Sequence, residues 1–149
     1  MIKTNGGFLV SQIKQIQNRV FDTLLRKYGI EEFNGAQGRI LYVLWQKDNL
    51  PIIELSRRTG LAKTTLTSML DRMEKNDFLK RTYDKTDRRQ IRITLTEKAK
   101  SLSAKYEEVS DLMSGLFYNG FSDTEIVDFE KYLERILINL TEENINGVI

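Results

Sequence analysis

Cations and hydroxyl groups gather in one segment of this 149-residue chain, and their chemistry suits an anionic partner. From Arg57 to Arg92 there are eleven Lys or Arg and five Asp or Glu, a net charge of +6, whereas the other residues together carry −4. The same segment holds a run of small hydroxylic residues, namely Thr64, Thr65, Thr67 and Ser68. Basic groups bind phosphate oxygens, and hydroxyl groups form hydrogen bonds with base edges. The segment therefore has the composition of a nucleic-acid contact surface.

Two residue types that carry much of enzyme chemistry are missing, because the chain has no histidine and no cysteine. This removes the imidazole base and imidazole metal ligand, and also thiol redox sensing and thiolate-bound metals. No glycine-rich phosphate loop occurs, and the adjacent pairs Glu31–Glu32 and Glu142–Glu143 are typical of solvated charge at turns. We therefore expect no enzyme, no metal and no cofactor.

The segment that carries the basic residues predicts two short helices joined by a tight turn. Pro51 suits the first turn of a helix, where its missing N–H is no loss, and Gly60 suits the end of that helix. A second apolar stripe follows with helical spacing, at Leu66, Met69, Leu70 and Met73. The opposite face is hydroxylic at its start and basic toward its end, as a helix in the major groove requires. An ordinary solvated face has a similar pattern, so this helix alone does not decide between the two interpretations.

A β-hairpin with a charged tip is predicted after the two helices. The first strand begins in residues 78–81, and the second, residues 90–95, alternates polar and apolar side chains. Between them the turn-forming sequence DKTDRR occupies residues 84–89. A basic tip of this kind reaches phosphates or the minor groove, whose negative potential attracts arginine. A mixed-charge tip also serves solubility, but its position directly after a helix pair favours nucleic-acid contact.

Three stretches are more specific: the tip Asp87-Arg88-Arg89, the letters LTEKA at 95–99, and EKNDFL at 74–79. They resemble the MarR family of bacterial transcription regulators. In that family an Asp-x-Arg pair is typical of the wing tip, and it maps here to Asp87 and Arg89. The resemblance implies that the carboxylate holds the guanidinium, which enters the minor groove. Arg88 is a competing candidate, because it is adjacent and equally cationic.

The resemblance also implies a fold and a domain layout. We expect a mainly α protein, a winged helix-turn-helix with a two-stranded β wing and a helical dimerisation region from both termini. The N-terminal dimerisation helix falls in residues 1–33, the DNA-binding domain in 34–96 and the C-terminal dimerisation helices in 97–149. Asp77 and Ala99 stand where the family commonly has glycine. Neither conflicts with DNA binding, because Asp tolerates a left-handed backbone and Ala favours a helix.

The terminal helices have wide apolar stripes that favour a dimer. The first predicted helix runs from Phe8 to near Gly29, with the stripe Leu9, Ile13, Ile16, Val20 and Leu24. A long helix follows the N-cap Thr96, and a last helix follows a capping box at Ser122. The simplest way to bury these stripes is a dimer, in which a second copy of the chain packs on them about a two-fold axis. The alternative is that the helices pack only within the monomer. A two-fold dimer places its recognition helices about 34 Å apart and predicts a pseudo-palindromic DNA site.

In such a complex the candidate DNA-binding residues divide by role. The phosphate contacts would be Arg57, Arg58, Lys63, Arg72, Lys75 and Arg88. The base contacts would be Thr64, Thr65, Thr67 and Ser68, with Arg72 as a candidate guanine reader. Arg89, braced by Asp87, would enter the minor groove beside each half-site.

MarR proteins often respond to a small aromatic or phenolic anion that binds between the dimer helices and the DNA-binding head. The candidate lining residues are Tyr28, Tyr42, Trp45 and Tyr106, with Arg19 or Arg39 for an acid group. Aromatic residues on buried helices are more often plain core, and no residue identifies a ligand.

The resemblance implies a repressor released by a small ligand, although activation would use the same DNA contacts. A winged helix that binds a protein partner without DNA is the alternative, and it predicts no salt-dependent DNA affinity. The chain has no 18-residue apolar run and no signal-peptide core, so we expect a cytoplasmic protein without membrane insertion.

Overall fold

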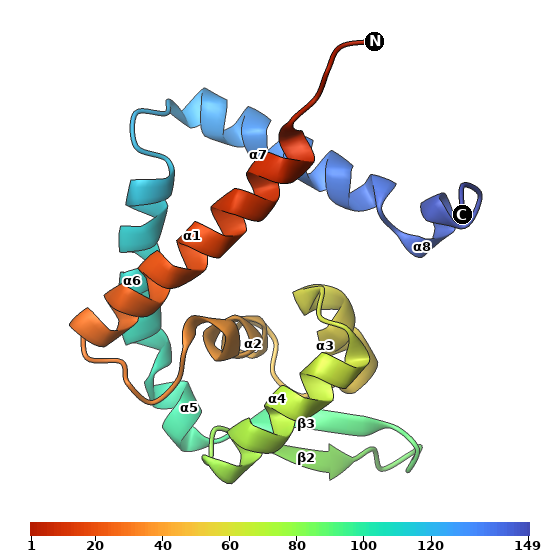
Figure 1. The fold of residues 1–149 in the computed structure, drawn as a ribbon. Coiled ribbons are helices and arrows are strands. Elements are labelled where there is room, and N and C mark those ends of the chain that lie inside the picture. Colours follow the sequence, from red (N-terminus) through yellow and green to blue (C-terminus); the bar gives the residue numbers. More distant parts are fainter. The chain divides into compact units, whose positions relative to one another are not determined.

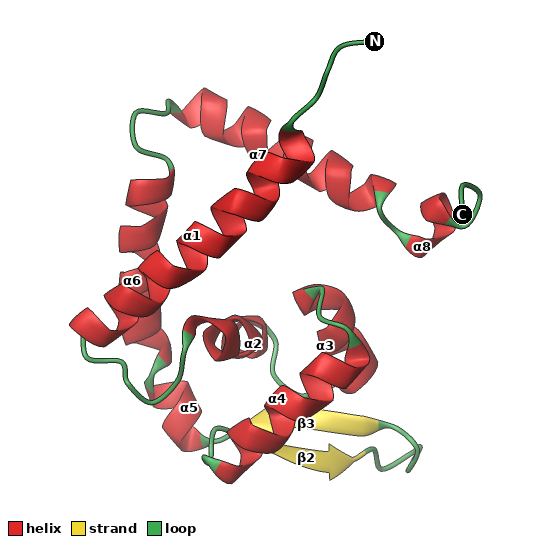
Figure 2. Ribbon diagram, viewed as in Figure 1, coloured by secondary structure: helices red, strands yellow, loops and turns green.

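The computed structural model describes residues 1–149 and is mainly helical, with one small antiparallel sheet (Figures 1 and 2). The elements follow in the order α1 Gly6–Lys27, α2 Gly35–Gln46, β1 Leu50–Pro51, α3 Ile52–Thr59, α4 Lys63–Lys75, β2 Leu79–Tyr83, β3 Ile91–Leu95, α5 Glu97–Ser101, α6 Ser103–Phe117, α7 Asp123–Asn139 and α8 Glu142–Ile145. The chain divides into two compact units, residues 1–113 and 114–149. The predicted winged helix-turn-helix, from α3 to β3, is confirmed and lies in the first unit.

The sheet has three strands, in the order β1-β3-β2, one more than the sequence predicted. The expected wing hairpin is present, and it pairs Leu79 with Leu95 at its base and Tyr83 with Ile91 near its tip. The extra strand is β1, whose Pro51 lies opposite Arg92 with an extended ψ of 149°. Pro51 therefore precedes α3 instead of lying in its first turn. A strand of two residues shows no alternation, so no hydrophobic pattern could predict it.

The core of the first unit lies under α4 and the sheet. The predicted apolar stripe of α4 is buried at Leu66, Leu70 and Met73, and Met69 is half-buried. Gly60 ends α3 with φ +74°, as its position predicted. Further fully buried side chains are Leu41, Leu44, Leu55, Phe78, Leu79 and Ile93. This packing fixes which face of α4 points outward.

Helix α1 buries a different face from the one its apolar stripe predicted. Phe21 and Leu25, which fit the stripe less regularly, are buried in the core. The stripe residues Leu9, Ile13 and Ile16 are 42–47% exposed. The first half of α1 therefore presents an uncovered apolar surface.

Side-chain caps start several helices, two of them at the predicted positions Thr96 and Ser122. The capping box at Asn34 and Gln37 is present at α2, and that at Ser122 and Glu125 is present at α7. The single long helix expected after Thr96 is instead two helices, α5 and α6, separated at Leu102. Near this break the hydroxyl of Ser101 donates to the carbonyl of Lys98 at 2.7 Å, a side-chain bond that bends helices.

Thr96 joins the end of the wing to α5, and its loss should cost stability. Its Oγ1 accepts the N–H of Ala99 at 3.2 Å and donates to the carbonyl of Asp77 at 2.6 Å. We expect Thr96→Ala to lower the free energy of unfolding by about 1 kcal/mol, since both the N-cap and the tie to Asp77 are lost. Urea unfolding followed by circular dichroism measures this. Thr65→Ala, at an exposed position of α4, is the control and should stay within about 0.5 kcal/mol of the wild type.

The second unit contains α7, which has no buried residue. Four aromatic rings pack around the turn before it, with centroids 4.9–6.4 Å apart, at Phe117, Tyr118, Phe121 and Phe129. Desolvation, helped by a hydrogen bond to Glu130, raises the pKa of Tyr118 to about 12. Beyond this cluster, Ile136 and Leu137 are 48% and 69% exposed. No helix of the chain has both the length and the apolar character of a membrane span.

Candidate nucleic-acid interface

The reading head, defined here as residues 50–95, holds α4 beside the β2–β3 hairpin (Figure 1). Because the core fixes the inner face of α4, its other face is presented to solvent along with the hairpin tip. Lys63, Thr64, Thr65, Ser68, Arg72 and Lys75 are all exposed on α4. Thr67 is half-buried, and its hydroxyl donates to the carbonyl of Lys63 at 2.8 Å. The first six residues of α4 thus include five of the candidate contacts, namely Lys63, Thr64, Thr65, Thr67 and Ser68. A helix that reads base edges needs such side chains near its N-terminus.

At the wing tip one arginine is held by a carboxylate and still projects into solvent. Asp87 Oδ1 accepts from Arg89 Nε at 3.2 Å and from the Arg89 backbone N–H at 3.0 Å. The Arg89 side chain is nevertheless 92% exposed. Arg88 is exposed and forms no ion pair in the structure. The geometry therefore separates the two candidates, since only Arg89 has the braced arrangement.

Asp84 organises the tip, although it is not among the site residues that the sequence predicted. Its Oδ1 accepts from the Thr86 hydroxyl at 2.6 Å and the Thr86 N–H at 2.8 Å, while its Oδ2 accepts from Arg92 Nε at 2.7 Å. These hydrogen bonds, first Thr86 and then Arg92, hold the pKa of Asp84 well below its usual range. Arg92 also donates to the carbonyl of Asn49 at 2.9 Å. The contact with Thr86 could be predicted, because Asp-x-Thr is a local turn signal. The contact with Arg92 depends on the register of the two strands and could not.

Two predicted phosphate contacts lie on α3 and share one carboxylate. Glu54 accepts from Arg57 Nη2 at 2.5 Å and from Arg58 Nε at 2.8 Å. These hydrogen bonds, first that of Arg58 and then that of Arg57, lower the pKa of Glu54 to about 2. The carboxylate is therefore charged at neutral pH. The stabilisation from these pairs is complete above the ordinary glutamate pKa and is lost as the pH falls through about 2.

Glu54 competes with phosphate for both arginines. We expect Glu54→Gln to raise DNA affinity about two- to fivefold and to steepen its salt dependence, because exposed ion pairs are weak and their loss frees two cations. Fluorescence anisotropy with labelled duplex DNA at several salt concentrations measures both effects. Glu97→Gln, which removes an equal charge on α5, is the control. Unchanged affinity in Glu54→Gln would show that Arg57 and Arg58 do not contact DNA.

Known proteins share this sequence pattern. Residues 33–91 match the MarR family. YsmB, an uncharacterized HTH-type transcriptional regulator of Bacillus subtilis, is 32% identical over 120 residues, which cover 76% of this chain and 75% of YsmB. The chain belongs to the MarR family. This is a family of DNA-binding transcription regulators, not of enzymes.

A further relative and a solved structure match different shares of the chain. TtmR, an HTH-type transcriptional regulator of Methylorubrum extorquens, is 32% identical over 98 residues, which cover 66% of this chain and 49% of TtmR. The match thus spans about half of that relative. A mutant MarR of Escherichia coli, in a crystal structure with operator DNA, has a TM-score of 0.77 at 20% identity and covers 88% of this chain and 92% of its own. At that identity the likeness shows the MarR fold alone.

Two of the four aromatic residues predicted to line a ligand crevice, Trp45 and Tyr106, belong to the core, whereas Tyr28 and Tyr42 are exposed. Tyr106 is 5% exposed, and its ring lies 5.0 Å from that of Trp45 and 6.4 Å from that of Tyr42. Burial raises the pKa of Tyr106 to about 12. Trp45 Nε1 donates to the carbonyl of Ala99 at 3.0 Å. A Cβ at Gly38 would lie 2.6 Å from the Tyr106 ring, so this packing depends on glycine there.

The other ligand candidates are more scattered. Arg39 is half-buried, donates to the side chain of Asn18 and lies near enough to Tyr106 to favour its ionised form. Arg19 is exposed on α1. Tyr28 is 38% exposed and lines a shallow hollow with Glu108, Asp111 and Leu112. The structure thus brings Arg39, Tyr42, Trp45 and Tyr106 together, but the surroundings of Tyr28 are acidic.

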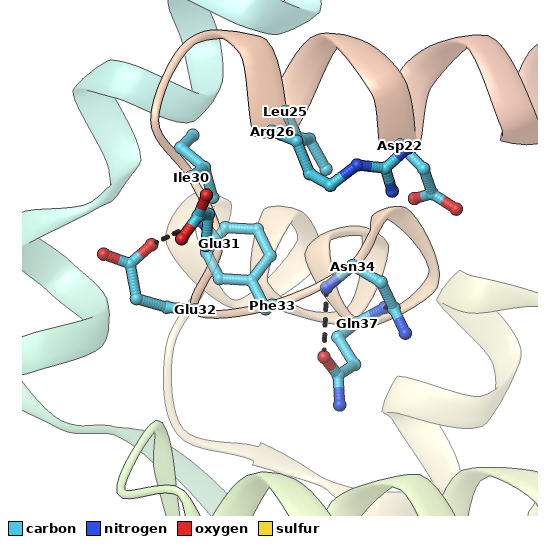
Figure 3. Close-up of a pocket in the computed structure, with 9 residues that line it drawn as sticks. All are labelled: Asp22, Leu25, Arg26, Ile30, Glu31, Glu32, Phe33, Asn34 and Gln37. Atoms are coloured by element: carbon cyan, nitrogen blue, oxygen red, sulfur yellow. Dashed lines mark hydrogen bonds between the residues drawn. The ribbon is translucent and has the colours of Figure 1, made fainter.

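A second hollow, of about 390 Å³, lies where α1 turns toward α2 (Figure 3). Its walls are Asp22, Leu25, Arg26, Ile30, Glu31, Glu32, Phe33, Asn34 and Gln37, none of them a predicted ligand residue. Asp22 Oδ1 already accepts the N–H of Gly35 at 2.7 Å, and Glu32 accepts the N–H of Glu31 at 3.0 Å. Three carboxylates and one guanidinium make this hollow unsuitable for an anionic ligand. No group of three or more acidic side chains is arranged to hold a metal ion.

Proposed function

We propose that this chain is a homodimeric regulator that binds a pseudo-palindromic DNA operator in a sequence-specific way. The observation that carries the proposal is the pairing of two exposed contact elements in one reading head. Helix α4 presents hydroxylic and basic side chains, and the wing presents a braced, exposed Arg89. The first suits the major groove and the second suits the minor groove. The operator complex of the Escherichia coli MarR protein supports the same use of this fold.

Each candidate residue takes a role from its place in the head. Thr64, Thr65 and Ser68 at the exposed start of α4 contact base edges. Thr67, whose hydroxyl donates to the helix backbone, offers only its lone pairs as acceptors. The phosphate contacts are Lys63, Arg72, Lys75, Arg88, Arg57 and Arg58, with Arg72 also a guanine reader. Arg89, held by Asp87, enters the minor groove.

The dimer is supported by where the apolar surface lies. In residues 34–96 only three large apolar or aromatic side chains are exposed, Tyr42, Ile53 and Tyr83. Helices α1 and α7 each expose five, namely Phe8, Leu9, Val10, Ile13, Ile16, Val127, Tyr132, Ile136, Leu137 and Ile138. An exposed apolar stripe marks a partner surface. Residues 1–33 and 97–149 thus form the dimerisation region around a DNA-binding domain in residues 34–96.

The regulator acts as a repressor in the cytoplasm, and a small aromatic acid releases it from DNA. The support is the cluster of Arg39, Tyr42, Trp45 and Tyr106, which joins a cation to three aromatic rings. Tyr42 is 48% exposed, so the ligand approaches from its side of the cluster. Because Tyr106 is buried in the core, a ligand that binds beside it would displace the packed aromatic rings. This displacement would link ligand binding to the position of the reading head.

Selection of bound duplexes from a randomised DNA pool tests the proposed function, with binding then measured against salt concentration. The expected product is a pseudo-palindrome with half-sites about one helical turn apart. Salt-dependent binding without a selected motif would contradict sequence-specific reading by α4. No binding by refolded, ligand-free protein at low salt would favour a winged helix that binds a protein partner.

A further inference from the structure

Arg81 of β2 joins the wing to the recognition helix through three hydrogen bonds to Glu74 and an ion pair with Asp71. Its Nη1 lies 2.6 Å from Asp71 Oδ1, and its Nη2 and Nε lie 2.9 Å and 3.2 Å from Glu74 Oε1. Its backbone N–H donates to Glu74 Oε2 at 2.9 Å. Asp71 and Glu74 are one turn apart on α4, so a single guanidinium reaches both carboxylates. No other side chain forms a hydrogen bond between α4 and the β2–β3 hairpin in the structure.

The contact has the geometry of a rigid clamp. The Arg81 side chain is only 28% exposed, and the planar guanidinium presents donors in a fixed fork. The backbone N–H and then the guanidinium of Arg81 lower the pKa of Glu74, so the carboxylate is charged at neutral pH. A lysine would keep the charge at this position but could not form the same fork with two acids.

The wing is held differently on its two faces. Arg81 lies opposite Ile93 in the hairpin, on the face that packs toward α4. Arg92 lies opposite Thr82, and it ties the tip residue Asp84 to the carbonyl of Asn49. Asn49 belongs to the turn before β1, not to α4. Of these two ties, only Arg81 therefore sets the position of the wing relative to the recognition helix.

We infer that Arg81 is a positioning residue that couples the major-groove contacts of α4 to the minor-groove contact of Arg89. The inference rests on the proposed function, because it assumes that both elements meet DNA together. A hairpin that moves freely beside α4 would present Arg89 in many positions, and most would miss the groove. The clamp also neutralises Asp71 and Glu74, which would otherwise repel phosphate near the base-reading face.

A double-mutant cycle tests the coupling. Arg81→Gln and Arg89→Ala are made singly and together, and affinity for the selected operator is measured by anisotropy. We expect Arg81→Gln to weaken binding about six- to tenfold, and Lys80→Gln, which removes a neighbouring unpaired cation, to weaken it less than about twofold. The cost of Arg89→Ala should fall from about thirtyfold in the wild type to less than about fivefold in Arg81→Gln. Arg81→Lys should reduce that cost similarly, because it restores charge without the fork.

Additivity would overturn the inference, because residues that share no partner and do not touch normally contribute independently. An equal cost of Arg89→Ala in both backgrounds would mean that Arg81 does not position the wing. Hydrogen exchange of the hairpin amides, measured without DNA, gives an independent result that holds even if the proposed function fails. Faster exchange over residues 79–95 in Arg81→Gln or Arg81→Lys than in Lys80→Gln supports the clamp, and equal exchange contradicts it. If Arg81→Gln does not fold, the double-mutant cycle and the hydrogen exchange are both measured with Arg81→Lys.

Discussion

Leu137→Glu is expected to convert the protein to a monomer and to weaken operator binding by at least about a hundredfold. Leu137 lies on α7, is 69% exposed in the single chain and belongs to a helix with no buried residue. A carboxylate there has no effect on the core of the reading head, but in a dimer interface it would be buried without a partner. Losing the second half-site removes the avidity of two linked heads, which is worth roughly 10²- to 10⁴-fold.

Light scattering after gel filtration measures the oligomeric state, and anisotropy measures binding to a full operator and to a half-site. Thr124→Glu adds the same charge at a polar, exposed position of α7 and is the matched control. The control should stay dimeric and bind like the wild type. A dimeric Leu137→Glu would place the interface elsewhere, and a monomer that still binds the full operator tightly would remove the need for a dimer.

The parts of the chain that could be predicted from the sequence are those with local signals. The stripe of α4 repeats at helical spacing, and the two capping boxes span four residues each. The brace at the wing tip joins Asp87 to a residue two positions later, so its partners lie together in any hairpin of this length. The pairing of Glu54 with Arg57 and Arg58 is equally local, because i+3 and i+4 neighbours on a helix lie side by side, so the spacing alone predicts both ion pairs.

The features that were missed depend on packing between distant segments. Both faces of α1 carry apolar residues, and only its contact with the core selects Phe21 and Leu25 for burial. Tyr106 on α6 fills the space above Gly38 on α2, so an apparent ligand residue is part of the core. The Arg81 clamp requires α4 to lie against β2 in one register. None of these relations has a fixed sequence spacing from which it could be predicted.

Arg89→Ala is expected to weaken operator binding about thirtyfold in the dimer. One good groove contact is worth at least about 1 kcal/mol, and a dimer makes it twice, so the expected loss is about 2 kcal/mol. The structure supports a contact of this size because Arg89 is pre-positioned by Asp87 and yet 92% exposed. Pre-positioning lowers the entropy lost when the side chain is immobilised on DNA. Anisotropy titrations against the selected operator measure the loss.

Substitutions at Arg88 and Asp87 distinguish the orienting effect of Asp87 on Arg89 from the effect of charge alone. Arg88→Ala removes the same charge one residue away, from a side chain without an ion pair, and should cost only about two- to threefold. Asp87→Ala removes a negative charge near DNA, so electrostatics alone predicts tighter binding. If Asp87 orients Arg89, binding should instead weaken, by about fivefold in the dimer, because the guanidinium is no longer held for the groove. Tighter binding by Asp87→Ala would show that Asp87 does not brace Arg89, and an equal loss in Arg88→Ala and Arg89→Ala would reduce the wing tip to non-specific phosphate contact.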